Sequence, residues 1–204
     1  MSKIPPRLAR REQMKKKANK MGGIFALFTV ISVGLSPHPF ILILCYLIHE
    51  LGHIFFARLM GARIEKLHMG SFHLSLSYDS SSLSYKREIL VEAGGIIFNL
   101  LSVLLLLLFP SFGEGREFFL ICSISLALMN LYPVSILDGG GILKNLLLCI
   151  LAGDVAEKVA KLVSFICAIL MWLIAVYVQI IFHASPSFFV ISVFLLIKLC
   201  FSYI

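Results

Sequence analysis

Long runs of apolar residues, separated by short polar segments, dominate the sequence. The runs lie at about 21–36, 39–60, 89–110, 118–137, 155–182 and 187–204. Each is long enough, or nearly so, to cross a hydrocarbon core of about 30 Å as a helix that rises 1.5 Å per residue. The pattern predicts an all-α polytopic membrane protein with about six transmembrane helices. A further apolar stretch at 142–152 is too short to cross.

One polar segment has a different period. Between 71 and 78 apolar and polar residues alternate strictly, with Phe72, Leu74, Leu76 and Tyr78 on one side. A period of two predicts a strand. Turn residues follow at 79–82, and 83–85 can return, so we expect a short β-hairpin between the second and third spans, at the cytoplasmic membrane surface. An amphipathic loop without a partner strand is the alternative.

The composition supports the membrane class. Hydrophobic residues make up 59% of the 204 residues and charged residues 14%, whereas soluble domains have roughly 45–50% and about 25%. These values exclude an ordinary soluble globule and a disordered chain. The five cysteines all lie in apolar runs and show no Cys-x-x-Cys spacing, so we interpret them as small hydrophobic residues rather than disulfide partners or zinc ligands.

The net charge of +7 is carried by the N-terminal tail, residues 1–20, which holds eight basic residues and one acidic residue. We interpret 1–20 as a basic cytoplasmic tail against anionic lipid, and not as a nucleic-acid site. The basic loops at 61–88 and 138–158 fall on the same side if six helices cross. We therefore expect a multi-pass protein with both termini cytoplasmic, and one transmembrane domain at 21–204 with its core at 39–145.

The second apolar run contains His49, Glu50 and His53. Two histidines at positions i and i+4 lie about 40° apart on one helix face, so both imidazoles can reach one ion. With Glu50 beside them they form the pattern of two zinc ligands and a general base. Ionisable residues at membrane depth are costly and usually functional. The alternative is a pair of buried histidines that are hydrogen-bonded to a neighbour.

A catalytic zinc site needs a third protein ligand. Asp138 is the candidate, because it follows the fourth run, which ends on the same side of the membrane as the second. Three glycines at 139–141 allow the backbone to come close. Pro133 lies inside the fourth run and should break or kink that helix. The alternative for Asp138 is a turn residue at the end of a helix.

These motifs resemble the site-2 protease family of intramembrane zinc metalloproteases. The resemblance is carried by His-Glu-Leu-Gly-His at 49–53 and by Asn130, Pro133 and Leu-Asp-Gly at 137–139. Residues 93–95 with Asn99 look like the family's Ala-Gly-Pro…Asn element, with glycine in place of proline. The predicted hairpin is also like the family's β element. In layout the chain is similar to the sporulation-type branch, but without a CBS domain.

The resemblance implies one zinc ion per chain, bound by His49, His53 and Asp138. Glu50 would be the general base, and Asn130 would hold the substrate backbone or the oxyanion. The substrate would be a transmembrane or membrane-tethered protein, cut near the cytoplasmic face in regulated intramembrane proteolysis. We also expect a bacterial cell membrane and a possible membrane regulatory partner, since the sequence shows no regulatory domain. The hydropathy and the placement of charge predict contact with the lipid bilayer and no nucleic acid.

Two other functions stay open. A catalytically inactive relative would bind transmembrane clients as a chaperone or inhibitor, and a metal-transporting channel would need polar residues spread through several spans. His68 and His73 in the loop are interpreted as surface residues. Glu92, in the third run, has no assigned role.

Overall fold

The computed structural model describes residues 38–62, 64–70, 73–78, 83–109, 113, 115–182 and 187–203. Its elements are α2 (Pro39–Leu59), β1 (Ile64–Gly70), β2 (His73–Tyr78), α3 (Tyr85–Leu108), α4 (Arg116–Leu131), α5 (Asp138–Leu148), α6 (Gly153–Phe182) and α7 (Ser187–Tyr203). The predicted tail at 1–20 and the predicted first span at 21–36 lie outside the described residues.

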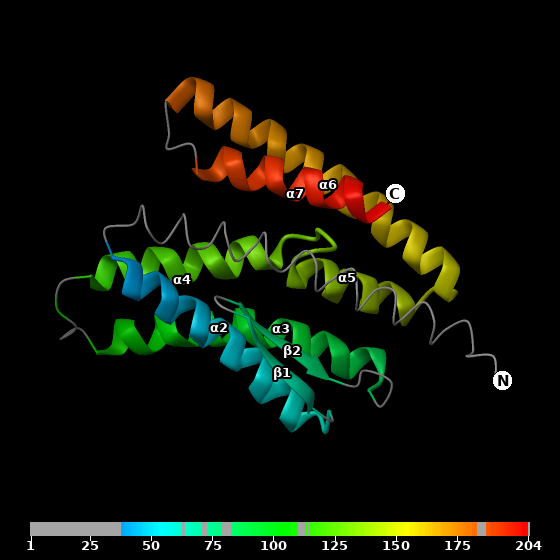
Figure 1. Ribbon diagram of the computed structural model, residues 1–204, viewed down its shortest axis with the longest axis horizontal. Helices are drawn as coiled ribbons and strands as arrows, with labels where there is room; N and C mark the ends of the chain where they lie inside the picture. The colour runs from blue at the N-terminus through cyan, green and yellow to red at the C-terminus, as the bar shows by residue number, and fades with distance from the viewer. Residues whose placement is uncertain are drawn as a thin grey trace.

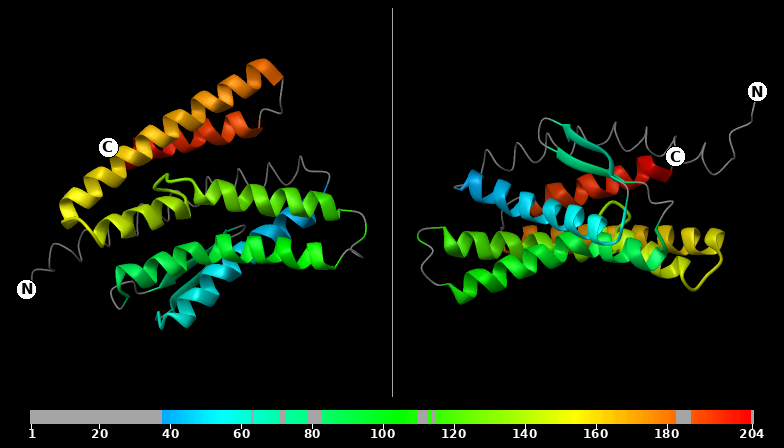
Figure 2. Two further views of the ribbon diagram at one scale, coloured as in Figure 1. Left: turned by 180° about the vertical axis from the view of Figure 1, so that it is seen from behind. Right: turned by 90° about the horizontal axis from the view of Figure 1, so that it is seen from below.

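The helices pack side by side, with α4 and α5 following one another through the middle of the molecule (Figure 1). On one side of them lie α2, α3 and the β-strands, and on the other side lies the pair α6–α7; the reverse view agrees (Figure 2). Helix α3 contacts α2, α4 and α5, whereas α6 contacts α5 and α7. Helix α3 is therefore the central element for the first half of the chain.

The helices α2 and α3 meet through glycine. A Cβ atom added at Gly52 would lie 2.2 Å from the carbonyl oxygen of Gly94, and one added at Gly94 would lie 2.6 Å from that of Gly52. Both distances are far below van der Waals contact, so only a residue without a side chain fits at either position. The two backbones touch at this point, as at other membrane helix contacts made by small residues.

The predicted fourth span is interrupted where the sequence places Pro133. Helix α4 ends at Leu131, residues 132–137 are non-helical, and α5 begins at Asp138. A Cβ atom at Gly139 would lie 2.2 Å from the carbonyl oxygen of Leu131, and one at Gly140 would lie 2.2 Å from that of Val134. Because these two glycines have no side chain, the first turn of α5 can contact the backbone of residues 131–134. With 11 residues, α5 is too short to cross a membrane.

The interruption at 132–137 is held by α6 and α7. Val134 and Leu137 are buried among two residues of α6 and two of α7, namely Ala168, Met171, Leu195 and Leu199. The hydroxyl of Tyr132 donates to the carbonyl of Cys167 at 3.1 Å, and the backbone N–H of Ser135 donates to the Ser164 hydroxyl at 2.7 Å. The second of these bonds satisfies a backbone N–H that the broken helix leaves unpaired, and the first ties the side chain of Tyr132 to α6.

Three described helices are long and apolar enough to cross a membrane by length and composition: Pro39–Leu59, Tyr85–Leu108 and Gly153–Ile181. Their exposed side chains are mostly leucine, isoleucine and phenylalanine, which suits a hydrocarbon solvent. Helix α4 has 16 residues, and the apolar stretch in α7 is Phe189–Cys200. The structure thus supports an integral membrane protein, while six crossings remain a prediction.

The strands β1 and β2 form an antiparallel pair in which Gly70 lies opposite His73 and Ile64 opposite Tyr78. The predicted return strand at 83–85 is wrong, because Ser84 occupies the N-cap position of α3 and Tyr85 begins that helix. The partner is instead the segment before the alternating residues. Glu65 and Lys66 are two polar residues in succession and interrupt the alternation there, so the pattern of β1 was too short to predict a strand.

The glycine contact between α2 and α3 predicts a large effect from one methyl group. We expect Gly94→Ala to lower the stability by about 1–3 kcal/mol, as overpacking of a close-packed contact usually does. Thermal unfolding in detergent would measure it as a lower Tm. Gly153→Ala is the control, since a Cβ atom there meets only Leu148 at 4.0 Å. Equal Tm values for the two variants would contradict the prediction.

Candidate functional site

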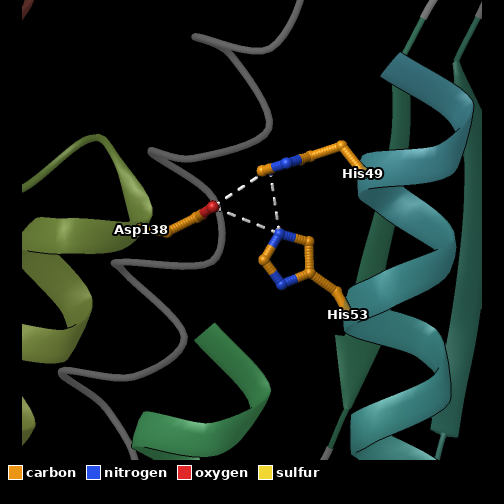
Figure 3. A group of neighbouring side chains, drawn as sticks. All are labelled: His49, His53 and Asp138. Carbon is orange, nitrogen blue, oxygen red and sulfur yellow. Dashed lines mark hydrogen bonds and ion pairs between the residues drawn. The ribbon is translucent and has the colours of Figure 1, made fainter. Parts of the chain in front are cut away.

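Three side chains from two helices converge inside the molecule. Figure 3 shows His49 and His53 extending from α2 toward Asp138, at the start of α5. The Oδ2 atom of Asp138 lies 3.0 Å from Nε2 of His49 and 3.3 Å from Nε2 of His53, and the two Nε2 atoms are 3.2 Å apart. The structure therefore brings the three predicted ligand residues together.

The protonation of His53 follows from its outer partner. Nδ1 of His53 lies 2.8 Å from the backbone carbonyl of Val91, on α3. A carbonyl only accepts hydrogen bonds, so Nδ1 carries the proton. In the neutral imidazole the lone pair then belongs to Nε2, which faces His49 and Asp138.

His49 is the more buried of the two histidines, with 4% of its surface exposed. Its Nδ1 atom lies 3.2 Å from the side-chain amide of Asn99, which is fully buried on α3. The oxygen of this amide, Oδ1, has no hydrogen-bond partner within the described part of the chain.

The Asp138 carboxylate completes the group. In its ionised form this side chain only accepts hydrogen bonds. Its Oδ2 atom is buried and makes no hydrogen bond of good geometry within the described part of the chain, in spite of the short distances to both nitrogens. An anionic oxygen and an Nε2 lone pair thus face each other at close range, which a cation between them would stabilise.

The spacing fits zinc. Zn²⁺ binds histidine nitrogen and carboxylate oxygen at about 2.0–2.2 Å in a tetrahedron, so neighbouring ligand atoms are about 3.3–3.5 Å apart. The observed separations of 3.0–3.3 Å need only a slight expansion. Three protein ligands leave one tetrahedral position for another oxygen.

Gly95 supplies the space for the two imidazoles. A Cβ atom at this position would lie 2.5 Å from both Cε1 of His49 and Nε2 of His53. The family's Ala-Gly-Pro element has proline at this position, where this chain has glycine. The contacts of an added Cβ atom explain why glycine fits here.

The two remaining predicted site residues are Glu50 and Asn130. Glu50 lies on α2, as both histidines do, and Asn130 lies on α4, the helix before Asp138. Glu50 is partly buried on α2, directly after His49. Asn130 lies in the last turn of α4, and its amide nitrogen donates to the Leu126 carbonyl at 3.0 Å. This bond uses one of the two N–H donors of the Asn130 amide.

Other residues singled out from the sequence lie outside the ligand group. His68 lies in β1 and His73 begins β2. The Glu92 carboxyl packs against Gly141 on α5, where an added Cβ atom would lie 2.9 Å from its Cδ. The sequence reasoning missed the Val91 carbonyl and left Asn99 without a role. A backbone carbonyl has no sequence pattern, whereas a lone asparagine in the third apolar run was a visible polar residue.

Two comparisons with known proteins found similar sequences or folds. The family model of Peptidase family M50 matches residues 109–174, a segment that contains Asp138 but not the two histidines. The solved structure of Site-2 Protease from Methanocaldococcus jannaschii is similar with a TM-score of 0.64 at 21% identity, covering 86% of this chain and 85% of that chain. No curated protein matches the chain.

The structural likeness shows a shared fold, and the family match adds the peptidase relationship. Together they support a zinc metalloprotease of the site-2 type.

The ligand group predicts a specific loss of metal. We expect about one zinc ion per chain in detergent-purified protein, and a large loss of bound zinc in Asp138→Ala because only two nitrogens remain. Elemental analysis of the folded proteins would measure both. Asp154→Ala, which removes an exposed carboxylate at the start of α6, should keep the wild-type content. Equal zinc in Asp138→Ala and wild type would contradict the assignment.

The contact at Gly95 predicts that one methyl group disturbs the metal site. Because the Cβ atom would displace both imidazoles, we expect Gly95→Ala to bind zinc more weakly than wild type. Titration against a zinc chelator would measure the change. Gly153→Ala, at an open position in α6, should bind zinc normally. An unchanged zinc affinity in Gly95→Ala would show that the helices adjust without cost.

Proposed function

Starting from the site-2 protease family, which the Peptidase family M50 match and the fold together support, we propose that the chain is an intramembrane zinc metalloendopeptidase. It cleaves a transmembrane or membrane-tethered protein near the cytoplasmic face. One observation carries the proposal: three ligand atoms from α2 and α5 lie 3.0–3.3 Å apart in a chain with long apolar helices.

In this proposal His49, His53 and Asp138 hold one zinc ion. When bound, zinc supplies Lewis-acid polarisation of the scissile carbonyl and lowers the pKa of a water ligand to about 7. The ion is fixed by two helices, since the histidines come from α2 and the aspartate from α5. Any motion of α5 relative to α2 would therefore change the site.

Glu50 is the general base. It follows His49 by one residue on α2, so its carboxylate can reach the side of the site that the ligands leave open. It takes a proton from the attacking water and later gives that proton to the leaving amine. General acid–base catalysis of this kind contributes about 10²–10⁴-fold to the rate.

Asn130 binds the substrate backbone or the oxyanion in this proposal. One N–H of its amide donates to the Leu126 carbonyl, and the amide has a second N–H with which it can donate to the substrate. Its place supports the proposal, because it lies just before the interruption at 132–137 that leads to Asp138.

The substrate must be extended before it is cut, because a helical carbonyl is hydrogen-bonded and shielded. The two-stranded sheet β1–β2 can supply partners, since each outer strand edge can pair with an added strand. Helix α2, which carries the histidines, contacts β2. We propose that the hairpin lies at the membrane surface and presents the extended segment to the site.

The orientation rests on the distribution of charge. Arg58 lies in the last turn of α2, and Lys86 and Arg87 lie in the first turn of α3. These ends are joined through the β-strands, so the basic residues share one side, which the positive-inside rule assigns to the cytoplasm. In the proposal both termini face the cytoplasm of a bacterial cell.

Substitution of the base separates a protease from a binding protein. We expect Glu50→Gln to bind zinc as wild type does and to lose cleavage by about 10²-fold or more. Co-expression with a panel of single-span proteins, tagged at both ends, would show fragments by immunoblot. A substrate found in this way should accumulate uncut with Glu50→Gln.

The control is Glu157→Gln, a carboxylate on α6 that pairs with Lys144 at 3.7 Å and should leave cleavage unchanged. Fragments of equal amount from Glu50→Gln and wild type would refute the role of Glu50. Clients that co-purify intact with both proteins would favour an inactive relative that acts as a chaperone or inhibitor.

A further inference from the structure

The structure contains a polar residue that the catalytic proposal leaves unused. Asn99 is fully buried in α3 and lies against His49. Burial of an amide is costly unless its polar atoms are hydrogen-bonded. Its place next to a metal ligand suggests what offsets that cost.

We propose that Asn99 is a positioning residue for His49, and that its amide oxygen accepts a hydrogen bond from Nδ1–H of that imidazole. The inference rests on the proposed zinc site. Through this bond Asn99 fixes the orientation of the ring and directs the Nε2 lone pair toward the metal. Ligating histidines commonly donate their second ring N–H to such a partner.

The hydrogen-bond pattern supports this orientation of the amide. With its nitrogen toward Nδ1 at 3.2 Å, the amide would require Nδ1 to accept, and its oxygen has no partner within the described residues. The proton of His49 would then sit on Nε2 and point at His53 and Asp138. A half-turn of the amide exchanges its nitrogen and oxygen, pairs the oxygen with Nδ1–H and frees Nε2 as a ligand.

His53 provides an internal comparison. Its Nδ1 donates to the Val91 carbonyl at 2.8 Å, which leaves Nε2 free to bind the metal. Both outer partners, Val91 and Asn99, belong to α3, whereas both histidines belong to α2. The acceptor for His53 is a backbone carbonyl, which no side-chain substitution removes. The proposed acceptor for His49 is a side chain, so a substitution at Asn99 can remove it.

The test is the zinc affinity of two Asn99 variants, measured in detergent by competition with a chromogenic chelator. Asn99→Leu has a similar size but no acceptor, and we expect its affinity to fall about 10–100-fold. Asn99→Asp offers only acceptor oxygens, and we expect its affinity to stay close to wild type. Ser192→Ala, which removes a buried hydroxyl bonded within α7, should leave the affinity unchanged.

The outcomes separate this inference from the proposed function. Wild-type affinity in Asn99→Leu, or a loss in Asn99→Asp as large as in Asn99→Leu, overturns the role of Asn99 while the zinc site stands. Wild-type protein that is folded and binds no zinc overturns the proposed function and this inference together.

A spectroscopic measurement covers the case in which Asn99→Asp or Asn99→Leu does not fold. Zinc-loaded protein with ring-¹⁵N-labelled histidine is compared by NMR with the smaller variant Asn99→Ala. We expect the Nδ1 proton of His49 to exchange slowly with solvent in wild type and faster in Asn99→Ala. Equal exchange rates in the two proteins overturn the inference.

Discussion

The backbone contact between α2 and α3 at Gly52 and Gly94 is the constraint on which the candidate site depends. It brings the two helices so close that groups on α3 reach the outer nitrogens of both histidines. Any side chain at either glycine would separate the helices and lengthen these hydrogen bonds. Lipid and protein interiors are equally apolar, so close packing rather than exclusion of water must hold such helices together.

The second requirement is that a carboxylate from a distant segment reaches the histidines. A continuous fourth helix would carry residue 138 past the site, and the interruption at 132–137 prevents this. The freed backbone N–H of Ser135 donates to the Ser164 hydroxyl of α6. The side-chain hydroxyl of Tyr132 donates to the Cys167 carbonyl of α6, and the apolar side chains are covered by α6 and α7. None of the three candidate ligands comes from the C-terminal helices, yet these helices stabilise the segment that places Asp138.

Most of the ligand group was predictable because ionisable residues in an apolar helix cost free energy on insertion into a membrane. Two histidines and a glutamate in an apolar run stand out in any sequence, and Asp138 before three glycines does so to a lesser degree. The strand β1 was not predicted, since Glu65 and Lys66 break its alternation and leave only a short alternating run at 66–70. The partner of His53 is a backbone carbonyl, which any residue at position 91 could supply. Helix ends within apolar runs were predicted only where Pro133 marked one.

The interlocking glycines bear on how such a centre can be copied into another scaffold. Transplanting two histidines and an aspartate onto a generic helical bundle would reproduce the ligands but not their separation, since ordinary leucine-rich helices pack 8–10 Å apart. A designer would have to begin with a backbone whose axes already approach closely, as at Gly52 and Gly94, and only then choose the metal-binding side chains. In this chain, residues without side chains specify the architecture that makes the chemistry possible.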